Sequence, residues 1–237
     1  MGAVQATGEG CCGARLGCET CRVRELAVCG VLNDAERRRL AAIGRSGRLG
    51  AGELLFCEGD PALEVFTVTS GVLKLYKLLA DGRRQITGFL VPGDFLGLAF
   101  RDHYVCTAEA VTELGLCRFR RRAFVELLRD LPHLEEQLLA RATSELAAAQ
   151  EQMVLLGRKT AMERVASFLL RLDERMGGGG RIQLPMNRTD VADFLGLTIE
   201  TVSRTLTRLK RRGLIALFGK SGVEIRDREG LLACAGC

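Results

Sequence analysis

The segment from residue 47 to residue 119 constrains the fold most, because short apolar runs alternate there with turn-forming residues. Gly-Asp, Ser-Gly, Asp-Gly and Pro-Gly-Asp interrupt these runs about every ten residues, at 59–60, 70–71, 81–82 and 92–94. Short strands with regularly spaced turns are typical of an antiparallel sandwich or barrel-like roll. We therefore expect a β-roll in this part of the chain.

Helical periodicity follows the predicted roll, first at 121–131 and then in a long segment after Pro132. From Ala142 onward, apolar positions recur at spacings of 4, 3, 4 and 3 residues, which is the pattern of a helix that pairs with a second copy. A helix packed on the chain's own roll has the same spacing, so the pattern leaves both arrangements open. The predicted dimerisation residues are Leu138, Ala142, Leu146, Ala149, Gln150, Met153 and Leu156.

Residues 187–212 read NRTDVADFLGLTIETVSRTLTRLKRR and predict two short helices joined by a sharp turn. Asn187 and Thr198 are suited to cap the two helices, and Gly196 is suited to a turn that needs a positive φ. Such a pair is the helix-turn-helix unit, whose second helix reads base edges in the major groove of DNA. The predicted DNA-binding residues are Arg188, Glu200, Thr201, Ser203, Arg204, Arg208 and, in a wing, Lys220.

The charge of the chain is unevenly distributed. Residues 158–237 carry 15 Lys or Arg against nine Asp or Glu, whereas residues 1–157 carry 19 against 20. A basic C-terminal part suits a polyanion, Arg204 can donate two hydrogen bonds to guanine, and Glu200 can accept one from cytosine. With the helix-turn-helix, these features predict double-stranded DNA as partner; taken singly, each also fits a solvated surface helix.

The stretch CETCRVRELAVC places three of the ten cysteines of the chain within residues 18–29. Clustered thiols in a reducing compartment bind metal more often than they form disulfides. Soft thiolates select zinc, copper(I) or iron–sulfur clusters, and a complete shell takes four of them. A fourth ligand is therefore needed, and composition alone does not choose among Cys11, Cys12, Cys57, Cys106, Cys117, Cys234 and Cys237.

Several segments resemble the FNR branch of the CRP/FNR family of bacterial transcription regulators. They are IETVSR at 199–204, QITGFLVPGDFLG at 85–97 and the N-terminal cysteines with Cys117. The resemblance covers nearly the whole chain and implies an α+β protein with a cyclic-nucleotide-binding-like β-roll, a long dimerisation helix and a C-terminal winged helix-turn-helix. The implied parts are a Cys-rich iron–sulfur segment at 1–32, the roll at 33–131, the helix at 132–157 and the DNA-binding domain at 158–237.

The resemblance also implies a function and a cofactor. It implies a cytoplasmic homodimer that binds a palindromic operator of the TTGAT type, activates transcription with RNA polymerase and senses oxygen through a [4Fe–4S] cluster. Carried over residue by residue, the cluster ligands are Cys18, Cys21, Cys29 and Cys117. Where the family carries an acidic residue in the helix seam, this chain has Gln150, which implies weaker repulsion between paired helices.

Two features keep alternatives open. Seven residues separate Cys21 from Cys29, a longer gap than the family's best-known spacing, and Cys106 is a rival fourth ligand. A regulator of the same fold with a zinc-held N-terminus, or with a small-molecule effector in the roll, fits these residues as well. A cyclic nucleotide is not expected, because no Arg-Ser pair follows residues 92–94 and Arg101 is isolated.

The sequence predicts neither an enzyme nor a membrane protein. His103 and His133 are the only histidines, and neither lies in a pattern typical of a catalytic triad. The G-x5-G-K-S pattern at 213–221 is one residue longer than a Walker A loop and precedes no predicted helix, so we interpret it as a wing. We find no signal peptide and no apolar run of about 18 residues, and we expect a cytoplasmic location.

Overall fold

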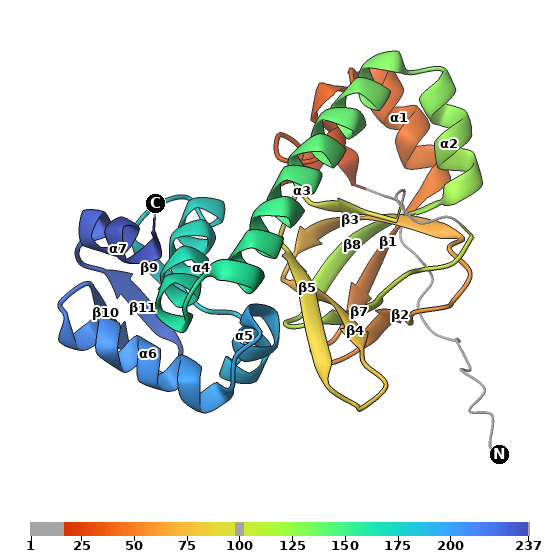
Figure 1. Cartoon of the computed structure of the whole chain (residues 1–237). Helices are drawn as coiled ribbons and strands as arrows, with labels where there is room; N and C mark the ends of the chain where they lie inside the picture. Colours follow the sequence, from red (N-terminus) through yellow and green to blue (C-terminus); the bar gives the residue numbers. More distant parts are fainter. Residues whose placement is uncertain (1–16, 98–101, 237) are drawn as a thin grey trace.

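The computed structural model describes residues 17–97 and 102–236, so Cys11, Cys12, Arg101 and Cys237 lie outside the described residues. Helix α3 (Pro132–Arg158) runs from a β-roll to a C-terminal helical domain (Figure 1). The expected α+β architecture of roll, long helix and winged helix-turn-helix is confirmed. The residue boundaries expected between its parts remain predictions. Within the described ranges, no helix is both long and apolar enough to cross a membrane.

The roll consists of two antiparallel four-stranded sheets, ordered β1-β8-β3-β6 and β2-β7-β4-β5. Phe66, Leu73 and Leu116 are buried between the sheets, because alternate residues of a strand point to the same face. The strands are β1 (Gly44–Leu49), β2 (Leu54–Phe56), β3 (Glu64–Ser70), β4 (Leu73–Leu78), β5 (Arg84–Leu90), β6 (Phe95–Leu96), β7 (Thr107–Ala110) and β8 (Leu114–Arg120).

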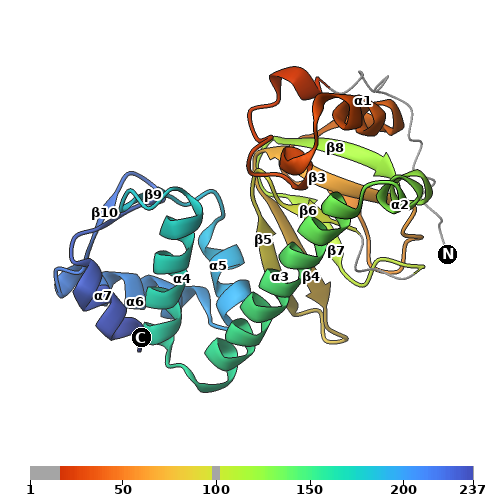
Figure 2. The same ribbon diagram turned by 90° about the horizontal axis from the view of Figure 1, so that it is seen from above.

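The cysteine-rich segment packs against one side of the roll, next to α3 (Figure 2). Asn33 and Glu36 exchange hydrogen bonds at the start of the following helix, which fixes where it begins. Val28 is buried with Phe124 and Leu134 in a core that joins this segment to α2 and α3. The elements here are η1 (Cys18–Thr20), η2 (Val28–Val31), α1 (Asp34–Ile43) and α2 (Arg121–Arg129).

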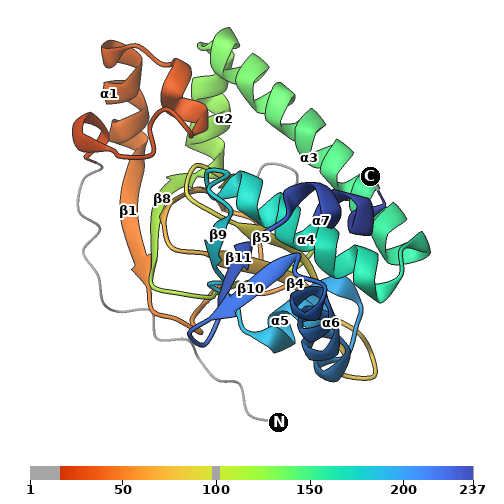
Figure 3. The ribbon, with the colours of Figure 1, turned by 90° about the vertical axis from the view of Figure 1, so that its left-hand side faces the viewer.

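The C-terminal domain is a winged helix-turn-helix, in which α4 packs beside α7 (Figure 3). Leu169, Leu195 and Leu209 are buried in its core. Gly196 has a φ of 61° and forms the turn after α5, a conformation that other residues adopt only with strain. The elements are α4 (Ala161–Arg175), β9 (Arg181–Gln183), α5 (Arg188–Leu195), α6 (Ile199–Arg211), β10 (Ile215–Phe218), β11 (Gly222–Ile225) and α7 (Arg228–Ala235).

Candidate DNA interface and thiol cluster

Helix α6 presents predicted base-reading residues on its outer side. The hydroxyl of Thr198 accepts a hydrogen bond from the backbone N–H of Thr201 at 3.2 Å, which caps the start of the helix. Val202 and Leu206 are buried and attach the inner side of α6 to the domain core. Of the predicted contacts on this helix, those exposed are Glu200, Arg204 and Arg208, and those half-buried are Thr201 and Ser203.

The Glu200 carboxylate is stabilised in its charged form. Hydrogen bonding from its own backbone N–H, and then from the Thr198 hydroxyl, lowers its pKa, and nearby Arg204 lowers it further. An ionised carboxylate only accepts hydrogen bonds, so it suits the amino group of cytosine. The exposed end of α6 therefore offers DNA a hydrogen-bond acceptor, Glu200, and a guanidinium that can donate two hydrogen bonds, Arg204.

Two predicted contacts lie beside the recognition helix rather than on it. Lys220 is exposed in the turn between β10 and β11, and Arg188 is half-buried at the first position of α5. The Arg181 guanidinium lies 4.5 Å from the centre of the Phe218 ring, which braces the wing at the strand that precedes Lys220. Positive residues in these places suit phosphate groups, which position a protein on DNA without reading sequence.

Arg164 of α4 joins three helices, and sequence analysis did not identify it. Its Nη1 donates to the carbonyl oxygen of Leu195 at 2.9 Å, and its Nη2 donates to that of Leu156 at 2.8 Å. Its Nε donates to the carbonyl oxygen of Lys159 at 2.9 Å. These carbonyls lie at the ends of α5 and α3, so one guanidinium caps both helices. Lys159 and Leu156 lie only five and eight residues before Arg164, but Leu195 lies 31 residues after it, and no local pattern indicates that contact.

One cavity of about 30 Å³ is lined by four cysteines, Cys18, Cys21, Cys29 and Cys117. Cys18 lies in η1, Cys29 in η2, and Cys117 in β8, where it pairs with Thr67 of β3. The other walls are largely apolar and include Val23, Ala27, Val28, Leu40, Phe119 and Phe124. Two segments that are distant in sequence thus bring four thiols to one place.

The remaining described cysteines lie elsewhere. Cys106, the rival fourth ligand, is buried in the core between the two sheets, together with Phe66. Cys57 is exposed, and Cys234 is half-buried with its sulfur 3.5 Å from Nη1 of Arg212. In the part of the chain that the structure describes, Cys117 is therefore the cysteine that shares a cavity with the N-terminal three.

The protein environment disfavours free thiolates in this cavity. Burial, and secondly the proximity of Cys18, Cys21 and Cys29, raises the pKa of Cys117 to about 12. Burial also raises the pKa values of Cys18 and Cys29, which nearby Arg37 partly offsets. Thiolates at this site would repel one another and are partly removed from solvent, and a bound metal cation compensates for both effects.

The donor set fits a soft metal centre, since zinc and iron–sulfur clusters are both bound by four thiolates. Among the described residues, however, no group of three or more Cys, His, Asp or Glu side chains is arranged so that it could hold a metal ion. The cavity gathers the four donors without fixing a coordination geometry. The assignment of Cys18, Cys21, Cys29 and Cys117 as ligands remains a prediction.

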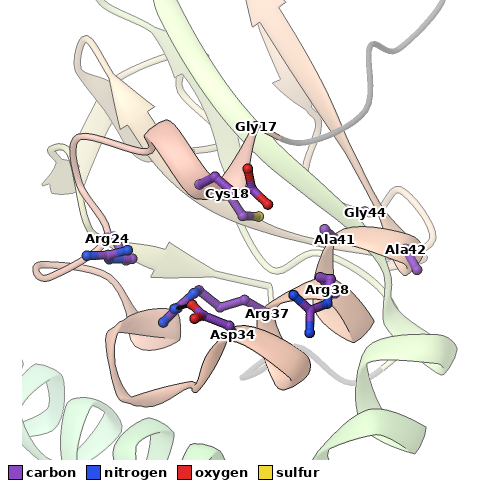
Figure 4. Close-up of a pocket in the computed structure, with 10 residues that line it drawn as sticks. Gly17, Cys18, Arg24, Asp34, Arg37, Arg38, Ala41, Ala42 and Gly44 are labelled. Carbon is purple, nitrogen blue, oxygen red and sulfur yellow. Dashed lines mark hydrogen bonds and ion pairs between the residues drawn. The ribbon is translucent and has the colours of Figure 1, made fainter.

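A larger, open pocket of about 800 Å³, whose lining residues are drawn in Figure 4, adjoins the thiol cavity. Cys18, Arg24 and Arg37 line both spaces. Arg37 pairs with Asp34 and donates to the carbonyl oxygen of Leu32, so its position is fixed from both sides. The thiol cavity therefore lies directly beside an open pocket, and Cys18 borders both.

Comparison with known proteins identifies the family. Residues 47–130 match the cyclic nucleotide-binding domain, and residues 163–234 match the Crp-like helix-turn-helix domain. The chain is 43% identical over 222 residues to the nitrogen fixation regulation protein FixK of Bradyrhizobium diazoefficiens, covering 92% of this chain and 93% of that protein. The chain belongs to the CRP/FNR family. It is a DNA-binding transcription activator of that family and not an enzyme.

Two further similarities extend over most of this CRP/FNR regulator. It is 40% identical over 227 residues to the transcriptional activator protein FnrL of Cereibacter sphaeroides, covering 92% of each chain. Its structure resembles that of FixK2 from Bradyrhizobium japonicum with a TM-score of 0.77 and 38% identity, covering 81% of this chain and 97% of that one. Both similarities include the roll and the DNA-binding domain.

Helix α3 of the CRP/FNR regulator has an exposed apolar stripe. Leu139, Leu146 and Met153 follow one another at intervals of seven residues, and their exposed fractions are 68%, 60% and 65%. Leu138 and Leu156 are half-buried and pack on cores of their own chain, and their role as dimer contacts stays a prediction. Leu139 was not predicted. The other predicted contacts, all exposed, are Ala142, Ala149 and Gln150.

A second pocket, of about 410 Å³, lies between strands β4 and β5 of the roll and helix α3. Arg175 donates to the carbonyl oxygen of Phe89 at 2.8 Å and pairs with Asp94 at its edge. Partial burial, and then repulsion from Asp94, raises the pKa of the Glu145 carboxyl, while Arg141 and Arg175 oppose that rise. Its lining contains no Arg-Ser pair.

Proposed function

We propose that this activator senses oxygen through a [4Fe–4S] cluster bound by Cys18, Cys21, Cys29 and Cys117. It would act in the cytoplasm as a homodimer that binds a palindromic TTGAT-type operator and works with RNA polymerase. The observation that carries the proposal is the single cavity that these four thiols line. This chain is 38% identical over 226 residues to the transcriptional activator protein anr of Pseudomonas aeruginosa. That relative is a transcription activator, as is the protein proposed here.

The cysteine-rich segment contacts helix α3 directly, which supports a link between the thiol site and the dimer. When bound, the cluster would supply an oxygen-labile bond between this segment and strand β8. Cys29 and Leu138 pack on the same apolar core, and the guanidinium of Arg141 on α3 donates to the carbonyl oxygen of Leu26. A rearrangement of residues 18–29 therefore acts on α3 without an intermediate element.

The exposed stripe of α3 supports the dimer. Three large apolar side chains at heptad spacing suit a two-stranded coiled coil, in which they would be buried against the partner helix. A two-fold dimer places two copies of α6 about one turn of DNA apart, so both half-sites are bound together. Gln150 lies beside this stripe and carries no charge, which favours close approach of the two helices.

Anaerobic purification with metal analysis tests the proposal. The wild-type protein should contain about four iron and four sulfide per chain, and the Cys117→Ser variant should lose both. The matched control is Cys106→Ser, since Cys106 is another cysteine of the roll, is buried and lies outside the cavity. Aeration of the wild type should then remove sulfide, dissociate the dimer and lower the affinity for a palindromic operator.

Other outcomes separate the alternatives. Zinc without sulfide, together with an operator affinity that air does not change, would support the zinc-held N-terminus. A Cys117→Ser protein with its full iron and sulfide content would exclude Cys117 as a ligand and, with it, the proposed bond between the two segments.

A further inference from the structure

A buried group of charges joins the roll to the first helix of the helix-turn-helix. Lys74 of β4 lies 2.9 Å from the carboxylate of Glu109 on β7 and 3.0 Å from that of Asp190 on α5. The Lys74 and Asp190 side chains are only 6% and 2% exposed. Buried charges of this kind are tolerated only when they are paired, so the roll and α5 depend on each other here.

Arg84 of β5 completes this group, which we name the roll–α5 lock: Lys74, Arg84, Glu109, Asp190 and Asp193. The guanidinium of Arg84 lies 2.9 Å from Asp190 and 2.8 Å from Asp193. Burial opposes its charge, but the neighbouring carboxylates more than compensate and raise the pKa of Arg84. Two cations of the roll thus hold two carboxylates on one face of α5.

Neutral contacts extend the lock towards the end of α5. Nε2 of Gln85 donates to the carbonyl oxygen of Asp193 at 2.8 Å, and Nε2 of Gln152 on α3 donates to that of Phe194 at 3.2 Å. The rings of Phe89 and Phe194 lie 5.3 Å apart. The roll and α3 therefore both contact the end of α5, directly before the turn that leads into α6.

The lock sets an orientation rather than the fold of the DNA-binding domain. The apolar face of α5, with Val191 and Leu195, is already buried within that domain. Buried ion pairs add little net stability compared with apolar contacts, but they demand specific partners and geometry. Glu200 and Arg204 stay exposed while the lock is closed, so the locked orientation leaves the base-reading residues accessible.

We propose that Lys74 and Arg84 are positioning residues for DNA binding. By holding Asp190 and Asp193, they fix the recognition helix relative to the roll and to α3. In a dimer built on α3, this sets the distance between the two recognition helices. The inference rests on the homodimer of the proposed function for its effect on palindromes, but it is independent of the metal site.

Charge reversal at Arg84 tests the lock. Arg84→Glu should lower the affinity for a palindromic operator by roughly 5- to 150-fold, while the affinity for a single half-site stays within about twofold. Pairing it with Asp193→Arg restores opposite charges and should recover much of the loss. Arg83→Glu is the matched control, because it makes the same change of charge one residue away. Arg83 pairs with Asp81 on the exposed side of the turn between β4 and β5.

Hydrogen exchange provides a readout that needs neither dimer nor metal. In the Arg84→Glu and milder Arg84→Gln variants, amides of α5 and β5 should exchange faster, while those of α6 should be unchanged. Unchanged exchange at α5 and β5 would overturn the lock, as would equal losses of palindrome affinity in Arg84→Glu and Arg83→Glu. A wild-type protein that sediments as a monomer would instead contradict the proposed homodimer, and the exchange result would still decide the lock.

Discussion

Arg141 and Leu26, separated by 115 positions in the chain, are joined by a hydrogen bond from the guanidinium of Arg141 to the carbonyl oxygen of Leu26. The same guanidinium donates to the carbonyl oxygen of Gly93 at 3.2 Å. A Cβ atom at Gly93 would lie 2.8 Å from Cβ of Leu26, so the turn approaches the cysteine-rich segment as closely as a glycine allows. Arg141 thus ties α3 to the thiol site and to the roll at once.

We expect Arg141→Met to uncouple the thiol site from DNA binding. The apolar stem of methionine keeps the packing, but the two carbonyl oxygens lose their donor. Iron and sulfide content after anaerobic purification should be unchanged, whereas the ratio of operator affinities without and with air should shrink by roughly 2- to 30-fold. Arg122→Met is the control, since Arg122 is exposed on α2 and pairs with Glu126. A full air response in Arg141→Met would contradict this role.

Leu146→Glu should weaken the dimer. In a two-fold seam the new carboxylate would face its copy, so we expect the dimer dissociation constant to rise at least about tenfold, as measured by sedimentation equilibrium. Leu63→Glu is the control, because Leu63 is 71% exposed on the roll, away from α3. If both variants dimerise like the wild type, the stripe of Leu139, Leu146 and Met153 does not form the interface.

Arg204→Ala and Lys220→Ala should weaken DNA binding in different ways. Arg204 on α6 is placed to read a base, so its loss should reduce discrimination between operators by on the order of tenfold. Lys220 in the wing is placed to contact phosphate, so its loss should weaken all sequences similarly and reduce the slope of log K against log salt by about one. Titration of matched and mismatched duplexes at several salt concentrations distinguishes the two. Equal loss of discrimination in both variants would place Lys220 at a base instead.

The helix-turn-helix could be predicted from the sequence because its signals are local. The side chains of Asn187 and Thr198 cap the two helices by accepting a hydrogen bond from the backbone N–H three positions further on. Gly196 adopts the positive φ that the turn needs. Each signal acts within a few residues, so one stretch of sequence contains both the cause and the effect. The roll was predictable for the same reason, since its turns lie at regular intervals.

The contacts that connect the parts were not predictable from the sequence. Lys74 and Asp190 are 116 residues apart, and neither lies in a pattern that indicates its partner. The exposed stripe of α3 shows a different limit: spacings of three and four residues allow more than one phase, and Leu139, which is exposed, was not among the predicted residues. Cys117 was selected by resemblance, because its place beside Cys18, Cys21 and Cys29 comes from the tertiary fold and not from a local pattern.

Base discrimination by Glu200 should not depend on pH across the ordinary range. Hydrogen bonds from its own N–H and from Thr198 hold its pKa below the usual value of 4.5. The carboxyl group is therefore ionised throughout the pH range above that value. The ratio of affinities for duplexes with and without cytosine at the contacted position should therefore be flat from about pH 8 to about pH 5.5, whereas Glu200→Gln should lower that ratio at every pH. Each ratio compares two duplexes on one protein, so general effects of pH on DNA binding cancel. A ratio that falls with a midpoint near pH 6 would show that the carboxyl takes up a proton, which these hydrogen bonds oppose.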